Sequence, residues 1–463
     1  MYIIKKEVGK KVTYATKNPL QKKYNDKVAK KLRECFNEKR ISLLANAEGL
    51  VKRDRKFNAM ALLSVMVFSE RKNYQVSLTE MCQHLFDKGI TITKQGLDKR
   101  LNKQAAGFLK SVMEELLKVK LLDDGINTVL KTFKGIKVID ATSFQLPDKL
   151  KNEYKGFGGG ATKSGIKTHY QIDITTGDAM GIEVLNATSS DTTTSLINPQ
   201  KGVLQLFDLG YISLDVLKKI AVNEAYYLCR IKYNTQIWIK TNHGFERLIW
   251  EKEIKKMYEG QIKELTVHIG AKREVECRLI IEKVPRQLAN QKRRKLKTDK
   301  VNKRKGLSKG RLGFCDLNVF ITNAATDQLP SENVRLVYRL RWQIEIYFKT
   351  WKSFMNIDKI QNMNVHRFNC THYGTLIYII LTSKIFFFFK HKYWGSHQIE
   401  LSELKAMKLL AKRIDTIWEL LFASTKSAHK GLKILVENLL TNCVKEHKKN
   451  VLMPFESINY ALS

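Results

Sequence analysis

The hydrophobic period of the chain changes near residue 131, and this change limits the folds that the chain can adopt. Before that point apolar residues recur at three-to-four spacing, as in Val28, Leu32 and Phe36, which is typical of amphipathic helices. After it, residues 135–146 alternate between apolar and polar side chains, which predicts a β-strand. We therefore expect a helical region over residues 1–130 and a strand-rich core after it.

The strand-rich core is predicted to have an α/β fold. A three-strand meander with a tight turn at Gly177-Asp178 is followed by a strand, a helix and a strand. These elements are expected at 135–146, 165–175, 180–186, 203–207, 214–223 and 226–231. Further apolar segments predict a β-rich insertion over 234–315, a second part of the core over 316–390, and a helical region over 391–463.

The charge of the chain points to a polyanionic partner. The sequence has 82 Lys and Arg against 45 Asp and Glu, a formal net charge of +37. Such an excess attracts phosphate backbones and argues against an ordinary metabolic enzyme. Residues 283–311 contain many Lys and Arg, including Arg293 and Arg294, and a single acidic residue, Asp299. This tract predicts a flexible surface loop or an arm that lies on phosphates.

The sequence predicts a reduced, cytosolic protein without a membrane span. The N-terminus lacks the apolar core of a signal peptide, and the seven cysteines are scattered without a C-x-x-C pair. The apolar stretch 373–389 is interrupted by polar residues, so we expect a buried core helix rather than a membrane helix.

Two short helices in the N-terminal region have the spacing of a helix-turn-helix. Ser77 and Glu80 resemble a capping box, a glycine turn follows, and Thr93 can cap a second helix. That second helix would present Lys94, Gln95, Lys99 and Arg100 to a DNA groove. An ordinary helical hairpin with a solvated basic face fits the same residues.

One later segment carries the pattern most suggestive of chemistry. On a single α-helix, with ~100° per residue, Tyr338, Arg341, Glu345 and Lys352 would share a stripe about 60° wide beside the apolar face. A carboxylate so placed can hold a metal ion beside a phosphate, although a surface ion-pair stripe has the same spacing.

Two acids follow or interrupt apolar strands, where packing does not explain them. Asp140 lies in the first predicted strand, and Asp208 ends the fourth. Together with Glu345 they predict three converging carboxylates, the ligands that hard divalent cations prefer. Two such ions can drive an in-line attack on phosphate, which is nuclease or strand-transfer chemistry. Asp191 is a rival second acid, but it follows no apolar strand.

The spacing Tyr338-x2-Arg341-x3-Glu345-x6-Lys352, with Asp208-Leu-Gly-Tyr and Asp140, resembles the DDE transposases of bacterial insertion elements, the insertion-sequence-four family. The resemblance implies an RNase H-like core with a mixed five-stranded sheet, interrupted by the β-rich insertion. It implies that the three acids hold two Mg²⁺ ions, for which Mn²⁺ can substitute.

The same resemblance implies several partners. Tyr338, Arg341 and Lys352 would contact double-stranded DNA at the transposon ends, and a homodimer would pair two ends, in a bacterial cytoplasm at the nucleoid. A base taken out of the stack would lie on an aromatic of the insertion, for which Trp238 and Trp250 are candidates, although both also fit as core aromatics.

Three functions remain open on the sequence. The first is a cut-and-paste transposase that cleaves the terminal inverted repeats and transfers the strands. The second is a transposase-derived DNA-binding protein that has lost catalysis, and the third is a generic RNase H-like nuclease. The presence of all three acids and of Lys352 favours the first.

Overall fold

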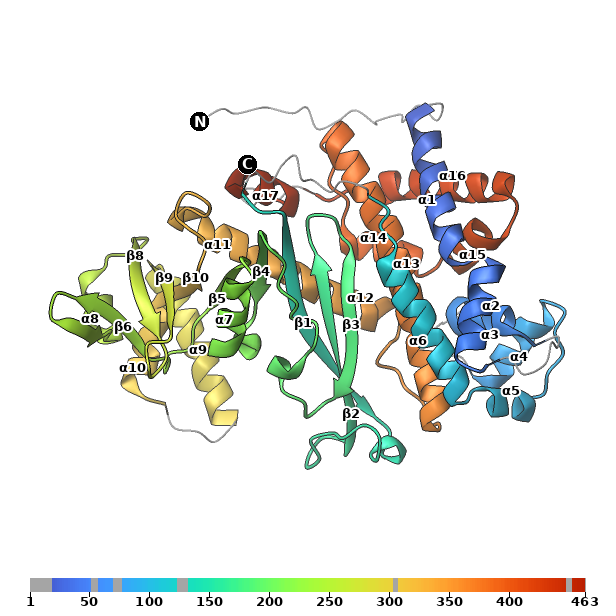
Figure 1. Ribbon diagram of the computed structural model, residues 1–463, viewed down its shortest axis with the longest axis horizontal. Helices are drawn as coiled ribbons and strands as arrows, with labels where there is room; N and C mark the ends of the chain where they lie inside the picture. The colour runs from blue at the N-terminus through green and yellow to red at the C-terminus, as the bar shows by residue number, and fades with distance from the viewer. Residues whose placement is uncertain are drawn as a thin grey trace.

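The computed structural model describes residues 19–50, 57–69, 77–122, 132–302, 307–446 and 452–462. A long sheet forms the centre of the molecule (Figure 1), with the N-terminal and C-terminal helices gathered at one end and the insertion at the other. The expected boundary at residues 130 and 131 lies outside the described residues.

The described N-terminal region is helical, as predicted. Its two short helices have the expected caps: Ser77 and Glu80 form a capping box at the start of α4, and the Thr93 side chain accepts a hydrogen bond from the backbone N–H of Gly96 in α5. The helices are α1 (Pro19–Cys35), α2 (Glu38–Ala47), α3 (Ala59–Phe68), α4 (Leu78–Phe86), α5 (Lys94–Arg100) and α6 (Lys103–Lys118).

The core sheet has mixed strand directions, which confirms the predicted α/β fold class. β1 pairs antiparallel with β2, and β2 antiparallel with β3, as expected for a meander. On its other edge β1 pairs parallel with β4, which pairs parallel with β5. The elements are β1 (Gly135–Leu146), β2 (Ser164–Asp173), β3 (Ala179–Asn186), β4 (Val203–Phe207), α7 (Leu214–Val222) and β5 (Tyr226–Arg230).

The sheet is longer than the five strands predicted, because the strands of the insertion continue it. β10 (Leu317–Thr322) pairs antiparallel with β5 on one side and with β9 on the other. The order is therefore β3-β2-β1-β4-β5-β10-β9-β8-β6-β7. The insertion comprises β6 (Ile237–Thr241), β7 (Gly244–Arg247), α8 (Trp250–Lys256), β8 (Ile262–Ile269), β9 (Val275–Lys283), α9 (Arg286–Asn302) and α10 (Lys309–Gly313).

The basic tract was expected to be a flexible loop or arm, and this expectation was wrong for most of its length. Residues 286–302 form the helix α9. Its residues include strong helix formers such as Lys, Arg, Gln, Leu and Ala, and Ala289 anchors it to the rest of the molecule because it is buried. Residues 303–306 lie outside the described residues.

The segment that carries the four-residue motif is not one uninterrupted α-helix. α11 (Ser331–Arg339) and α12 (Gln343–Phe354) are separated by a 3₁₀ turn over Leu340–Trp342. Tyr338 therefore lies in the first helix, Arg341 in the turn, and Glu345 and Lys352 in the second helix. The regular 100° stripe predicted for a single helix does not hold across the turn.

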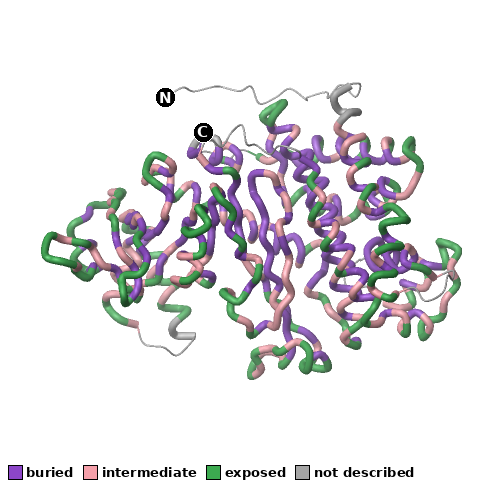
Figure 2. Tube along the Cα trace, viewed as in Figure 1, coloured by how far each residue is buried: buried purple, intermediate pink, exposed green. Residues whose placement is uncertain are grey.

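The predicted core helix is α13 (Val365–His397). Its length and apolar composition would suffice to cross a membrane, but 94% of its most apolar 18-residue window is buried inside the protein. Most residues of α13 are buried, and in Figure 2 buried segments fill the part of the molecule where Figure 1 labels this helix. The C-terminal helices α14 (Glu403–Leu410), α15 (Ile414–Phe422), α16 (Thr425–Asn442) and α17 (Pro454–Leu462) complete this end of the molecule. All seven cysteines are free thiols, as predicted.

Candidate active site

Asp140 lies in the middle of β1, with its carboxylate largely buried against the motif segment. One carboxylate oxygen accepts the backbone N–H of Ala141 at 2.8 Å, and the other accepts a guanidinium N–H of Arg341 at 2.9 Å. Burial raises the pKa of Asp140 to about 6, and the negative charges of Asp208 and Glu345 add to the rise. The three predicted acids therefore share one electrostatic site.

Asp208 directly follows β4, at the carboxyl end of a strand that is parallel to β1. Its side chain is half-buried and makes no hydrogen bond or ion pair with another described residue. Its charge nevertheless raises the pKa values of Asp140 and Arg341. An unpaired carboxylate at the end of a core strand is available to a cation.

Arg341 joins the first and last acids. Its guanidinium donates one hydrogen bond to Asp140 and a second, at 2.7 Å, to Glu345, so that it bridges β1 and α12. The ion pair between Arg341 and Glu345 is the one that a surface stripe would contain. The second contact of Arg341, to Asp140 on β1, does not belong to such a stripe. The guanidinium side chain is 12% exposed, so water screens these charges only weakly.

The donor set suits a divalent cation in its chemistry. Three carboxylates share the site, and a positive group already lies between two of them. In the described part of the chain, however, no group of three or more His, Cys, Asp or Glu side chains is arranged to hold a metal ion. The Arg341 guanidinium instead bridges Asp140 and Glu345.

Tyr338 connects the motif to the strand that ends at Asp208. Its hydroxyl donates a hydrogen bond of 3.1 Å to the carbonyl oxygen of Phe207, and its ring lies 5.2 Å from that of Phe320. The Arg341 guanidinium lies 5.9 Å from the ring centroid of Tyr338. Burial raises the pKa of the phenol, so Tyr338 is a neutral donor that fixes α11 to β4.

Lys352 lies two turns beyond Glu345 on α12, and its ammonium is 5.2 Å from the ring of Phe144. Phe144 is on the same face of β1 as Asp140, because successive side chains of a strand alternate. α12 therefore runs along β1, with Arg341 and Lys352 above different parts of that strand. Lys352 has no ion-pair partner among the described residues, so its charge is available to a phosphate.

The rival acid Asp191 lies close to the site but is already paired. Its carboxylate accepts a hydrogen bond of 2.9 Å from the Lys167 ammonium and packs against Gly210, two residues after Asp208. The neighbouring His169 is fully buried, and its ring nitrogen Nδ1 is 2.8 Å from the Tyr211 hydroxyl. These contacts give Asp191 and His169 a structural explanation that needs no metal.

The predicted recognition residues lie on α5, away from the acids. Lys94, Gln95 and Lys99 are exposed. Arg100 is half-buried, donates to the backbone carbonyl of Gly96 and lies 5.4 Å from the ring of Phe57. Three of the four side chains are therefore free to contact a groove, while Arg100 also stabilises its own helix.

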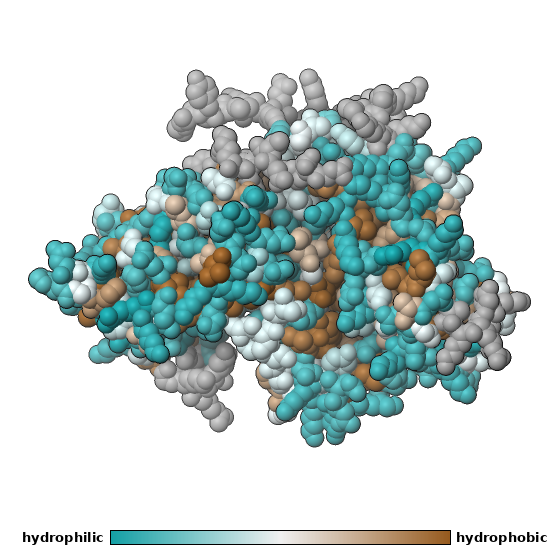
Figure 3. Space-filling model, in the orientation of Figure 1, coloured by the Kyte–Doolittle hydropathy of each residue, from teal (hydrophilic) through white to brown (hydrophobic). Residues whose placement is uncertain are grey.

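The two arginines predicted to contact DNA in the basic tract differ in their surroundings. The Arg293 guanidinium is used inside the protein, by Asn290, the carbonyl of Leu312 and the carboxylate of Asp316. Arg294, the next residue of α9, is exposed. Exposed residues of this kind give the visible face of Figure 3 its mainly hydrophilic surface.

The two candidate stacking aromatics also have partners in the insertion. Trp250 is buried and donates from its indole N–H to the carbonyl of Tyr233. Trp238 is half-buried, donates to the carbonyl of Gly270, and has the Arg273 guanidinium 4.9 Å from its ring centroid. Trp250 is thus a core aromatic, whereas Trp238 is only half-buried.

Sequence reasoning missed the contacts that hold the motif segment in place. Neither the hydrogen bond from Tyr338 to Phe207 nor the cluster around Arg278 at the start of α11 follows from a local pattern. The alternation of β9 could have indicated that Arg278 is half-buried and needs a partner, but it could not have identified that partner.

Comparisons with known proteins find similar transposases over most of the chain. The family model described as "Transposase DDE domain" matches residues 131–377, which include all three acids. The transposase for insertion sequence element IS231E of Bacillus thuringiensis subsp. finitimus is 31% identical over 443 residues, covering 91% of this chain and 92% of its own. The transposase for insertion sequence element IS1151 of Clostridium perfringens is 28% identical, covering 91% and 93%.

A solved structure with weak similarity was also found. The cryo-EM structure of a piggyBac transposase synaptic complex with hairpin DNA covers 91% of this chain and 86% of its own, with a TM-score of 0.42 and 12% identity.

Proposed function

The chain belongs to the DDE-domain transposases of bacterial insertion elements, and we propose that Asp140, Asp208 and Glu345 are its catalytic carboxylates. As a member of this family it is a DNA-cleaving and strand-transferring enzyme that depends on a divalent metal. The observation that carries the proposal is the Arg341 bridge, which ties an acid of β1 to an acid of α12 beside the end of β4.

Asp140, Asp208 and Glu345 would hold two Mg²⁺ ions, or Mn²⁺ in their place. When bound, such ions activate a water or a 3′-hydroxyl and stabilise the leaving oxygen of a phosphodiester. Burial is the main cause of the raised pKa of Asp140, with smaller contributions from the charges of Asp208 and Glu345, and a nearby cation would favour the ionised carboxylate.

Arg341, Tyr338 and Lys352 would contact the DNA backbone next to the acids. Arg341 now donates to Asp140 and Glu345, and the same two-pronged donor set would suit the oxygens of a phosphate once those acids hold metal ions. The unpaired Lys352 supplies a second positive charge farther along α12. Tyr338 would hold the strand end at Asp208 in place during the reaction.

The remaining basic surface would bind the transposon ends and the target. Lys94, Gln95 and Lys99 on α5 can read a groove, with Arg100 supporting their helix. Arg294 on α9 can contact the backbone, while the side chain of Arg293 positions that helix. We infer a homodimer that pairs two ends of double-stranded DNA, acting in the bacterial cytoplasm at the nucleoid.

The reaction would be cut-and-paste transposition. Hydrolysis at the end of the element frees a 3′-hydroxyl, which attacks the opposite strand and closes a hairpin. A second hydrolysis reopens the hairpin, and the freed 3′-hydroxyl attacks target DNA. Each step is an attack on one phosphodiester, so the same three carboxylates can serve them all.

The test is cleavage of a labelled DNA fragment that carries the terminal inverted repeat. Asp208→Ala and Glu345→Gln are expected to reduce Mg²⁺-dependent cleavage by about 10³-fold or more, while end binding in a gel-shift assay is retained. Asp191→Asn is the matched control, because it removes a nearby acid that Lys167 already neutralises. Normal cleavage by Glu345→Gln would overturn the site, and loss of cleavage in Asp191→Asn alone would favour the rival acid.

A further inference from the structure

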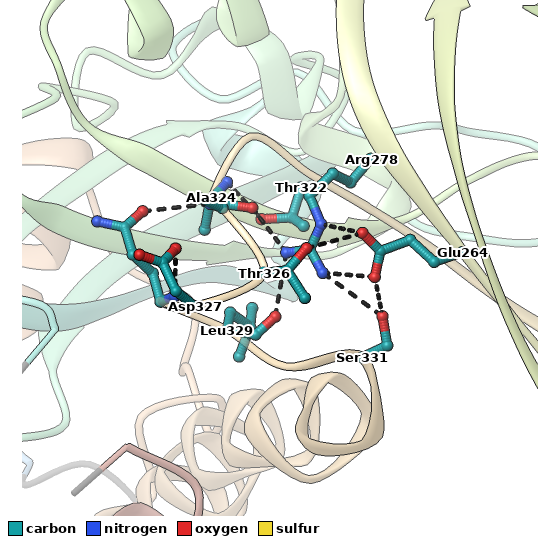
Figure 4. Close-up of polar contacts among 10 residues, drawn as sticks. Glu264, Arg278, Thr322, Ala324, Thr326, Asp327, Leu329 and Ser331 are labelled. Carbon is teal, nitrogen blue, oxygen red and sulfur yellow. Dashed lines mark hydrogen bonds and ion pairs between the residues drawn. The ribbon is translucent and has the colours of Figure 1, made fainter.

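A polar cluster in the insertion reaches the loop that leads into the catalytic segment. The cluster consists of Arg278 on β9, Glu264 on β8, Thr326 in the loop before α11, and Ser331 at the first residue of α11 (Figure 4). We propose that Arg278 is a positioning residue for catalysis, which sets the placement of α11 and hence of Tyr338 and Arg341. The proposal rests on the catalytic site proposed above.

The Arg278 guanidinium is fully used, with its donors divided between two parts of the chain. Nε and Nη2 bind the two carboxylate oxygens of Glu264, each at 2.7 Å, in a two-pronged ion pair. Nη1 donates to the backbone carbonyls of Ala324 at 2.7 Å and Leu329 at 3.0 Å. Nη2 also reaches the hydroxyl of Ser331 at 3.4 Å. Its planar fork can satisfy all of these partners only in one orientation.

Glu264 is fixed from the opposite side. It lies diagonally across the β8–β9 ladder from Arg278, since Thr266 is paired with Arg278 and Glu264 with Ile280. The hydroxyls of Thr326 and Ser331 donate hydrogen bonds to its carboxylate. The Arg278 guanidinium and these hydroxyls lower the pKa of Glu264 to about 2. The carboxylate is therefore ionised at every pH at which the enzyme would act.

These contacts hold the start of α11, which has no side-chain cap. Pro330 occupies the N-cap position and makes no side-chain cap hydrogen bond, so the start of the helix is not closed locally. The charge of Glu264 beside Ser331 is also favourable at the positive end of the helix dipole. Ser331, the first residue of α11, donates its hydroxyl to Glu264 rather than closing the helix.

The polar cluster is connected to the proposed active site through α11. α11 is a rigid element of nine residues, about 13 Å long. Its first residue, Ser331, belongs to the polar cluster, and Tyr338 near its other end donates a hydrogen bond to the carbonyl of Phe207, the residue before Asp208. The next turn carries Arg341. A shift at the start of α11 would therefore move the groups that surround the carboxylates.

The first variant is Arg278→Lys, which keeps the charge but cannot span both Glu264 and the two carbonyls. Cleavage at saturating end DNA is expected to fall about 10–100-fold, as expected for a displacement near 1 Å. The Kd for end DNA is expected to change less than threefold. Backbone amides of 334–342 should exchange hydrogen faster in the DNA-free protein. Lys263→Met is the control, because it breaks an ion pair on β8 that does not touch the loop.

A charge swap separates positioning from stability. Glu264→Arg combined with Arg278→Glu keeps the ion pair across β8 and β9, but it presents a carboxylate to the carbonyls of Ala324 and Leu329. The swap is expected to recover thermal stability relative to either single variant, without recovering cleavage. Recovery of both would overturn the proposal, because Arg278 would then serve only the stability of the insertion.

Two further outcomes are informative. Cleavage and amide exchange like those of the wild type in Arg278→Lys would also overturn the proposal. If that variant does not fold, Thr326→Val removes one donor to Glu264 with little change in volume, and a cleavage rate equal to that of Lys263→Met would again overturn it. Glu345→Gln, assayed in parallel, tests the catalytic site itself: cleavage by that variant refutes the site, whatever Arg278 does.

Discussion

Replacing Arg341 by glutamine tests whether its guanidinium stands in for a cation. The substitution removes the positive charge between Asp140 and Glu345 and keeps a side chain that can still form hydrogen bonds. We expect Arg341→Gln to be less stable than the wild type when metal is absent, and to gain more stability than the wild type when a divalent metal is added.

The magnitude follows from the two contacts. A hydrogen bond that involves a charged group contributes about 1.5–3 kcal/mol. The bond to Asp140, whose side chain is 19% exposed, belongs within that range, whereas Glu345 is 33% exposed and its bond is discounted for screening by water. The expected loss in the free energy of unfolding is therefore about 3 kcal/mol. A metal at 100 times its Kd contributes about 2.7 kcal/mol, enough to offset most of that loss.

The assay is urea unfolding followed by tryptophan fluorescence, in EDTA and in Mn²⁺, with calorimetric titration of Mn²⁺ as a second readout. Arg335→Gln is the control, because Arg335, on the preceding helix α11, forms a more exposed ion pair with Glu282. Its expected loss is about 0.5 kcal/mol. Equal stability of Arg341→Gln and the wild type in EDTA, together with equal Mn²⁺ affinity, would refute the reasoning.

Three other predictions concern acid stability, the helical core and DNA recognition. Burial lowers the pKa of His372 to about 4, whereas a histidine in the unfolded chain has a pKa of ~6.5. The unfolded chain therefore takes up the proton at a higher pH, and the free energy of unfolding falls by up to roughly 3 kcal/mol between pH 6.5 and pH 4. Acid unfolding of His372→Phe should lack this loss, and unchanged acid sensitivity of that variant would contradict the prediction. Lys390→Met removes an ion-pair partner of the buried Glu403 and Glu400. Denaturant unfolding should show a decrease of about 3–5 kcal/mol in the free energy of unfolding, and a decrease below about 1 kcal/mol would contradict the prediction. Lys99→Ala should make the slope of log K for end binding against log salt concentration shallower by about one, while the cleavage rate at saturating DNA stays unchanged. An unchanged slope in a salt titration would exclude a contact between Lys99 and a phosphate.

Core strands such as β1 and β4 could be predicted from the sequence because the pattern of apolar residues within each segment determines which side chains are buried. β1 and β4 begin and end at the predicted residues, since apolar alternation and apolar runs directly reflect burial. The caps of α4 and α5 were predicted for the same reason, because an N-cap and its partner lie within three residues. The positions of Asp140 and Asp208 relative to their strands followed from these elements.

Features that depend on partners far along the chain could not be predicted. The pairing of β10 with both β5 and β9, which merges the insertion with the core sheet, leaves no mark on the sequence of any one strand. α9 was missed for another reason. The density of Lys and Arg indicated solvation, but a helix also forms when one face finds partners, and Lys292 finds the carbonyl of Leu317 and the side chain of Asn318.

The site shows the same division between local and distant information. The spacing from Arg341 to Glu345 is local, and their i,i+4 ion pair could be anticipated. The second bond of Arg341, to Asp140, spans 201 positions and depends on how α12 lies on β1. A motif spacing can therefore indicate which side chains meet substrate, but it cannot show that one of them holds two acids together before any metal binds. This is why Arg341, rather than an acid, is the most informative residue to replace: its loss changes the charge of the site and leaves every proposed metal ligand in place.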